Sequence, residues 1–105
     1  KPKIKYFLGF SAEKFNTYFI DSPIKRIGWE SFMRNVILAG GNSRQKKLIV
    51  DIKKFLTNSN ALISGTAIWA CGQLMNQKEK EYLKNIYFSN ESNKYVIFEW
   101  RQFND

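Results

Sequence analysis

Histidine is absent from this 105-residue chain, and cysteine occurs once, as Cys71. Without histidine, Ser-His-Asp triads, imidazole acid–base catalysis and nearly all zinc sites are excluded. A lone cysteine forms no intrachain disulfide, so the redox compartment cannot be inferred from pairing. Because Cys71 lies in an apolar stretch, we interpret it as a small buried hydrophobe. The sequence therefore predicts no cofactor and no metal site.

The chain also lacks an apolar run long enough to cross a membrane. Residues 55–77 carry no charge, but their apolar part is about fifteen residues long, short of the roughly twenty needed. No signal peptide is visible, and the chain begins at Lys1 rather than Met, so we expect a fragment or a processed product. Its localisation stays open, with the cytoplasm favoured, as does its oligomeric state. The length predicts one domain, residues 1–105.

Acidic residues are scarce relative to basic ones. The chain has 9 Asp and Glu against 17 Lys and Arg, which gives a net charge of +8. Such an excess favours a polyanionic partner, either nucleic acid or an acidic protein, although lysine codon usage in an AT-rich genome would also produce it. Only 4 of the basic residues are arginine. Since lysine is a point charge and arginine a bidentate fork, this balance indicates diffuse electrostatics over base readout.

The hydrophobic pattern predicts a small α+β domain with an N-terminal strand, three to four helices and a C-terminal β-hairpin. Residues 3–10 alternate apolar and polar side chains, which is typical of a half-buried strand. Residues 83–88 and 94–100 form the expected hairpin, with residues 89–93 as its turn. In its second strand, Val96, Phe98 and Trp100 alternate with Tyr95, Ile97 and Glu99.

Helices are predicted between these ends of the chain. Ser11 is a predicted N-cap, and Pro23 is suited to a first helical position. Further on, residues 29–37 and 48–56 carry apolar residues at helical spacing, and Asn60 ends a polar segment that can cap the next one. Residues 61–75 fit either a helix or a hairpin turning at Gly65-Thr66, and we prefer the helix. The apolar stripes consist of Trp29, Phe32, Met33, Val36 and Ile37, and of Leu48, Ile49, Ile52, Phe55 and Leu56.

Gly40-Gly41 has two interpretations. The segment Val36-Ile37-Leu38-Ala39-Gly40-Gly41-Asn42-Ser43-Arg44 resembles the start of the sugar-nucleotide and molybdopterin nucleotidyltransferase fingerprint. That resemblance implies a strand feeding a glycine-rich loop whose amides hold phosphates. The preceding residues, however, have helical periodicity from Trp29 onward, so we interpret the glycines as the end of a helix.

The best candidate surface is a basic arc with five cations in eleven residues and only Asp51 opposing them. Lys1, Lys3 and Lys5 form a second cluster near the N-terminus. A positively charged surface of this kind can follow a phosphate backbone, although a solvated helix face has the same composition. The nucleic-acid-binding residues predicted from the arc are Arg44, Lys46, Lys47, Lys53 and Lys54.

Other patterns support weaker hypotheses. Asp51 and Lys53, with Glu30, would suit a metal-dependent nuclease only on a strand, where residues two apart point the same way. Glu99 and Arg101 are the one pair that a histidine-free ribonuclease toxin could use. The C-terminal aromatics could stack RNA bases, but core packing explains them better. These are Tyr95, Phe98, Trp100 and Phe103.

We therefore expect a small basic accessory domain, non-catalytic rather than enzymatic, that binds nucleic acid through a lysine-rich helical face. Its origin would be bacterial or phage. The leading alternative is a protein-binding module, such as an immunity protein, an inhibitor or a phage-encoded regulator, that docks on an acidic partner. The ribonuclease toxin is the remaining alternative.

Overall fold

Helices form all the regular secondary structure in residues 3–103, the part of the chain that the computed structural model describes. Seven are α-helices, and short 3-10 helices connect several of them. The expected α+β fold is therefore wrong, because this part of the chain contains no strand. The elements are α1 (Ile4–Leu8), α2 (Ala12–Tyr18), η1 (Pro23–Ile27), α3 (Gly28–Asn42), η2 (Lys46–Leu48), α4 (Ile49–Ile52), η3 (Lys53–Phe55), α5 (Ala61–Leu74), α6 (Gln77–Tyr87), η4 (Phe88–Asn90) and α7 (Lys94–Gln102).

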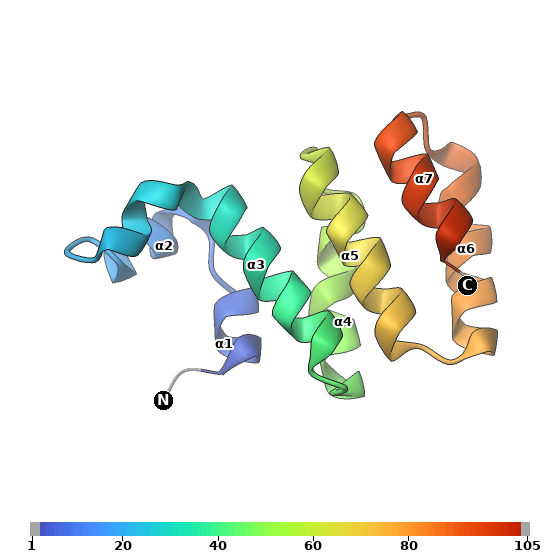
Figure 1. Ribbon diagram of the computed structural model, residues 1–105, viewed down its shortest axis with the longest axis horizontal. Helices are drawn as coiled ribbons and strands as arrows, with labels where there is room; N and C mark the ends of the chain where they lie inside the picture. The colour runs from blue at the N-terminus through green and yellow to red at the C-terminus, as the bar shows by residue number, and fades with distance from the viewer. Residues whose placement is uncertain (1–2, 104–105) are drawn as a thin grey trace.

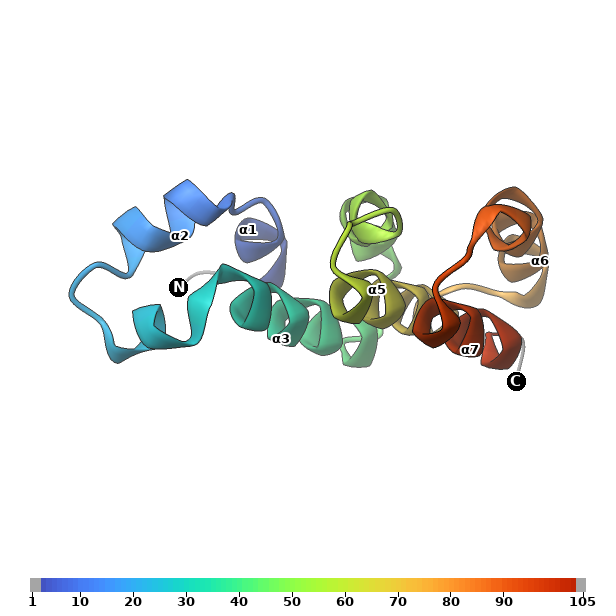
Figure 2. The same ribbon diagram turned by 90° about the horizontal axis from the view of Figure 1, so that it is seen from above.

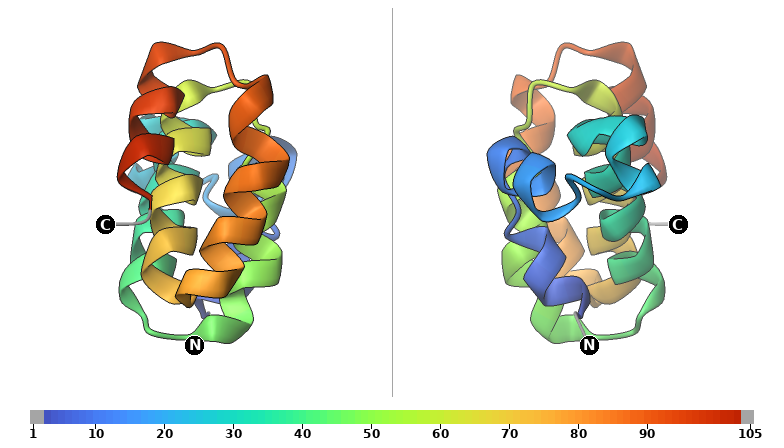
Figure 3. Two further views of the ribbon diagram at one scale, coloured as in Figure 1. Left: turned by 90° about the vertical axis from the view of Figure 1, so that its right-hand side faces the viewer. Right: turned by 90° about the vertical axis from the view of Figure 1, so that its left-hand side faces the viewer.

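The helices lie in two rows. Figure 2 shows α3, α5 and α7 side by side in one row, with α1 and α2, α4 and α6 in the other. In Figure 1 the first row runs in one direction, while α4 and α6 return in the other. The end-on views show the same two rows from either side (Figure 3). The helices thus form a two-row stack, and the molecule has extents of 43 × 28 × 17 Å.

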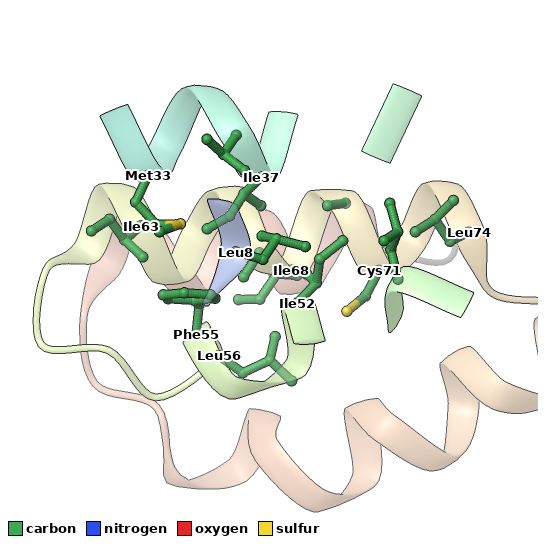
Figure 4. Packing of buried hydrophobic residues seen from close by; sticks show 14 of the residues in the cluster. Leu8, Met33, Ile37, Ile52, Phe55, Leu56, Ile63, Ile68, Cys71 and Leu74 are labelled. Carbon is green, nitrogen blue, oxygen red and sulfur yellow. The ribbon is translucent and has the colours of Figure 1, made fainter. Parts of the chain in front are cut away.

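Helix α5 lies at the centre of the molecule, which explains its lack of charge. It packs against α3 on one side, α7 on the other, and α4 with η3 behind. Figure 4 shows side chains of α3, α4 and η3, among them Met33, Ile52 and Phe55, packed against those of α5. Its N-cap is Asn60, whose side-chain oxygen accepts from the backbone N–H groups of Leu62 and Ile63 at 2.9 and 3.2 Å. The helical interpretation of residues 61–75 is confirmed, and so is the cap.

Gly41 brings α3 and α5 into close contact. A Cβ added there would lie 2.6 Å from Cζ3 of Trp69 and 2.9 Å from the Cα of Ala70. Gly40 and Gly41 are buried inside α3, which continues to Asn42. The prediction that they end the helix is wrong, because their small size serves packing between helices. The phosphate-binding loop implied by the nucleotidyltransferase resemblance is not formed, since no strand precedes the glycines in the described chain.

Residues 3–10, predicted as a strand, instead form the short helix α1 and contribute rings to an aromatic cluster. Its rings come from α1, α2 and α3, and neighbouring centroids lie 5.0 to 6.3 Å apart. The indole N–H of Trp29 donates to the carbonyl of Phe10 at 2.8 Å and ties the segment to α3. A strand requires a hydrogen-bonding partner, whereas a helical turn satisfies its own backbone, so ring packing decides the conformation here. The principal rings are those of Phe7, Phe10, Phe15, Phe19 and Phe32.

The predicted C-terminal hairpin is also wrong, because residues 77–87 and 94–102 are helices. Asn76 and Glu79 form a reciprocal capping box at the start of α6, and Asn93 caps α7. The polar run expected to be a hairpin turn therefore ends with a helix cap. In α7, Val96, Trp100 and Phe103 are buried at helical spacing, while the side chain of Phe98 is 54% exposed.

Several local predictions are confirmed. The hydroxyl of Ser11 accepts from the N–H of Lys14 at 3.0 Å, and Pro23 begins η1. Both predicted helical stripes contribute to the core, although the second is divided among η2, α4 and η3. None of the helices in residues 3–103 is both long and apolar enough to span a bilayer.

Candidate functional site

A tight turn between α3 and η2 places Arg44 at its tip. Arg44 has a φ of 61°, the only positive value for a non-glycine residue in the described chain. Ser43 holds the turn, since its hydroxyl donates to the carbonyl of Gly40 at 2.6 Å and accepts from the N–H of Gln45 at 3.1 Å. A left-handed conformation costs a non-glycine residue roughly 1–2 kcal/mol. Such strain is concentrated at functional sites, so this turn is a candidate for one.

The five residues predicted to bind nucleic acid are all exposed, but they do not lie on one continuous helix. Arg44 is in the turn, Lys46 and Lys47 are in η2, and Lys53 and Lys54 are in η3. In the described chain, Arg44, Lys47 and Lys53 form no ion pair. Their charges are therefore not neutralised by an acidic side chain in direct contact.

The N-terminal basic cluster converges on this region. Lys3 and Lys5 line a groove of about 480 Å³ together with Lys47, Ile4 and Gln45. Helix α1 packs against α3 and α4, which brings residues more than forty positions apart to the same place. Lys1 lies outside the described residues. The groove unites Lys3, Lys5 and Lys47, and the exposed cations of the same segments complete the candidate set. We call this set the basic surface: Lys3, Lys5, Arg44, Lys46, Lys47, Lys53 and Lys54.

Asp51 lies within the basic surface and holds two of its lysines. Its carboxylate is 2.8 Å from Nζ of Lys5 and 3.7 Å from Nζ of Lys54, and its side chain is 17% exposed. The nuclease hypothesis required Asp51 and Lys53 on a strand, but they lie on successive helical segments. Asp51 thus organises lysines, and no group of three potential metal ligands occurs within residues 3–103.

A further ion pair extends this region to α6. Nζ of Lys46 lies 3.1 Å from Oε1 of Glu79, in the first turn of α6. The backbone N–H of Asn76, followed by the Lys46 ammonium, lowers the pKa of Glu79. The lysines at positions 78 and 80 flank this contact in sequence. Local pattern analysis missed the link, because more than thirty residues separate the two partners.

Cys71 has no reactive role in this arrangement. Its side chain is fully buried, and burial raises the pKa of its thiol to about 12, an effect that Lys53 only partly opposes. A thiol with such a pKa stays protonated at neutral pH and is a poor nucleophile. The interpretation of Cys71 as a small buried hydrophobe is confirmed.

The C-terminal candidates are separated by the helical conformation of α7. Trp100 and Phe103 are in the core, while Tyr95 and Phe98 are exposed, so the four aromatic residues do not form one stacking platform. Residues two positions apart on a helix point in different directions, so Glu99 and Arg101 do not form a catalytic pair. Glu99 instead lines a pocket between α5 and α7.

A larger hollow of about 550 Å³ lies at the other end of α5 and α7. Its polar groups have structural roles, because Asn58 and Glu91 accept hydrogen bonds from nearby backbone N–H groups. Asn93, which also lines it, caps α7. These side-chain oxygens therefore already accept backbone hydrogen bonds that stabilise the loops.

The described chain is thus a two-row stack of helices in which Lys3, Lys5 and Lys47 line one groove. No family model, curated protein sequence or solved structure matches this chain. A function must therefore be argued from the placement of its residues.

Proposed function

We propose that this chain is a non-enzymatic accessory domain that binds nucleic acid through the basic surface. The observation that carries the proposal is the groove in which Lys3, at the N-cap of α1, and Lys5 of α1 meet Lys47 of η2. Two basic segments distant in sequence thus supply one patch. Binding to a phosphate backbone requires several positive charges close together and does not require contacts to the bases.

The side chains suit phosphate contacts. Lysine ammonium groups are flexible point charges that adapt to the spacing of phosphates, and Arg44 adds a fork that binds one phosphate through two N–H groups. The turn holds Arg44 outward through the hydrogen bonds of Ser43. The arrangement supports binding with little sequence preference at the basic surface itself.

Titration with labelled nucleic acids tests the proposal. Fluorescence anisotropy with single- and double-stranded RNA and DNA, repeated at several salt concentrations, would give the dependence of affinity on salt. Four to six phosphate contacts predict a slope of about −3 to −4 for single strands in a plot of log Kobs against log salt concentration. Absence of binding at low salt would contradict the proposal and would leave an acidic protein as the candidate polyanion.

Asp51→Asn is expected to tighten nucleic-acid binding by about two- to fivefold at low salt. The substitution removes the one carboxylate that contacts Lys5 and Lys54 and would repel a nearby phosphate. The side chains of Lys5 and Lys54 are 65% and 71% exposed, and ion pairs to such solvent-exposed lysines contribute at most about 1 kcal/mol to stability, so folding should persist. Asp21→Asn, at an exposed site outside the basic surface, is the matched control. Weaker binding by the Asp51 variant would show that ordering the lysines matters more than removing the negative charge.

A further inference from the structure

A small pocket of about 240 Å³ opens between the C-terminal halves of α5 and α7 and the first turn of α6. It is smaller than the roughly 300–1,000 Å³ sites that take drug-sized ligands, so a single planar ring system is the appropriate occupant. The pocket combines an indole, two primary amides, an ammonium group and a carboxylate. Its lining consists of Trp69, Gly72, Gln73, Lys80, Glu99, Gln102 and Phe103.

Glycines shape the α5–α7 contact on which this pocket lies. A Cβ at Gly72 would lie 3.2 Å from the ring of Phe103, and one at Gly65 would lie 3.4 Å from Cγ of Glu99. Trp69 is held from the opposite side, because its ring packs on Gly41 of α3. The aromatic wall and the carboxylate of the pocket are therefore placed by packed helices rather than by loops.

Glu99 is the chemically unusual member of this pocket. Burial raises the pKa of its carboxyl group, and within residues 3–103 it has no hydrogen-bond or ion-pair partner. Lys80 lines the same pocket without pairing with it. A partly desolvated carboxylate without a partner is costly unless N–H donors reach it, so a ligand that brings such donors would be favoured.

Guanine brings the matching donors. An ionised carboxylate only accepts hydrogen bonds, and guanine presents two adjacent donors, N1–H and the 2-amino group, on one edge. Adenine, cytosine and uracil each place an acceptor beside the donor on that edge, and this acceptor would repel the carboxylate. Gln73 and Gln102 also line the pocket, and their primary amides supply N–H donors suited to the guanine O6.

The pocket is also connected to the basic surface. Lys46 of that surface contacts Glu79, and the next residue, Lys80, lines the pocket. The α3–η2 turn and the α5–α6 connection lie along the same edge of the molecule in Figure 1. A strand whose phosphates follow the basic surface could therefore place one unstacked base in the pocket.

We infer that the Trp69–Glu99 pocket binds a guanine base, held by the carboxylate of Glu99 through N1–H and the 2-amino group. The inference rests on the proposed function in taking single-stranded RNA as the source of that base. A free guanine nucleotide offers the same edge, so the experiment must distinguish these sources.

Short single-stranded RNAs of uridine alone, and the same RNAs with one central guanosine, adenosine or inosine, provide the test. The guanosine RNA should bind about tenfold more tightly than the adenosine RNA. Inosine lacks the 2-amino group and should lose most of that advantage. Glu99→Gln should abolish the guanosine preference, so that the variant binds the guanosine RNA no more tightly than it binds the uridine RNA. Glu81→Gln, on the exposed part of α6, should retain the preference.

The outcomes separate the two proposals. Equal binding of guanosine and adenosine RNAs by the unaltered protein would overturn the pocket assignment, while salt-dependent binding of the uridine RNA would keep the proposed function. Binding of GMP without binding of any RNA would assign the pocket to a free nucleotide and overturn the proposed function. Binding of neither would overturn both. The inosine comparison needs no protein variant, so misfolding of a variant cannot obscure the result.

Discussion

Replacement of Arg44, Lys47 and Lys53 by glutamate is expected to weaken binding of single-stranded RNA by about a hundredfold or more at low salt. Each substitution removes a positive charge from the basic surface and adds a repulsive one, and each favourable phosphate contact is worth about 1 kcal/mol. Because these three residues form no ion pair within the described chain, the change breaks no salt bridge of the fold. Fluorescence anisotropy would measure the loss, with circular dichroism to verify folding.

A second triple variant controls for net charge. Glutamate at Lys25, Arg26 and Lys94 gives the same overall charge from exposed positions on η1 and α7. Its affinity should stay within about fivefold of the unaltered protein, since charges far from the bound phosphates are screened over about 10 Å. Equal losses of affinity in the two triple variants would mean that net charge alone attracts the RNA. The assignment of binding to the basic surface would then be contradicted.

Gly41→Ala is expected to destabilise the fold by about 2–3 kcal/mol, whereas Gly40→Ala is expected to be nearly neutral. Both gain about 1 kcal/mol of helix propensity. At Gly41 the new methyl group would lie 2.9 Å from the Cα of Ala70, so the backbones of α3 and α5 must separate. At Gly40 the nearest atom is the terminal Cδ1 of Ile52, at 3.1 Å, which can rotate away.

Urea denaturation followed by circular dichroism would measure both alanine variants. Labelling of Cys71 offers a second observation, because the sole cysteine is buried and becomes reactive when the fold opens. The Gly41 variant should react faster than the Gly40 variant. If Gly41→Ala proved as stable as Gly40→Ala, the close contact between α3 and α5 would be contradicted.

Local features of the sequence predicted helical structure between residues 11 and 75. The stripe from Trp29 to Ile37 and the Asn60 cap depend on residues within a few positions of each other, and both are present in the structure. The choice between helix and hairpin for residues 61–75 was also correct. The margin was small, because the β-branched residues of this segment favoured a hairpin and α5, which is buried on several sides, shows no single apolar face.

The strands were wrongly predicted because short apolar patterns fit two periods. Val96, Phe98 and Trp100 alternate, but Val96, Trp100 and Phe103 equally fit a helix. Only burial distinguishes the two, and it places Phe98 outside the core. Likewise, a glycine that ends a helix and a glycine that lets a neighbouring helix approach look alike in sequence. The role of Gly41 can be assigned only when its packing against α5 is known.

The candidate site, like the fold, was predictable from the sequence only where its residues lie close together along the chain. Arg44 and the lysines of η2 and η3 were identified from their closeness in sequence, and all are exposed. The meeting of Lys47 with Lys3 and Lys5 depends on the packing of α1, and the Glu99 pocket depends on the contact between α5 and α7. Neither arrangement leaves a local signal, since the partners are brought together by the tertiary fold.

Chemical-shift mapping by NMR tests the central claim most directly. During titration of the labelled protein with single-stranded RNA, the amides of residues 3–5, 43–48 and 53–54 should show the largest shifts. Those of η1, at the far end of the molecule, should barely change (Figure 1). Shifts spread evenly over the chain, or concentrated on η1 and α2, would contradict the assignment of phosphate binding to the basic surface.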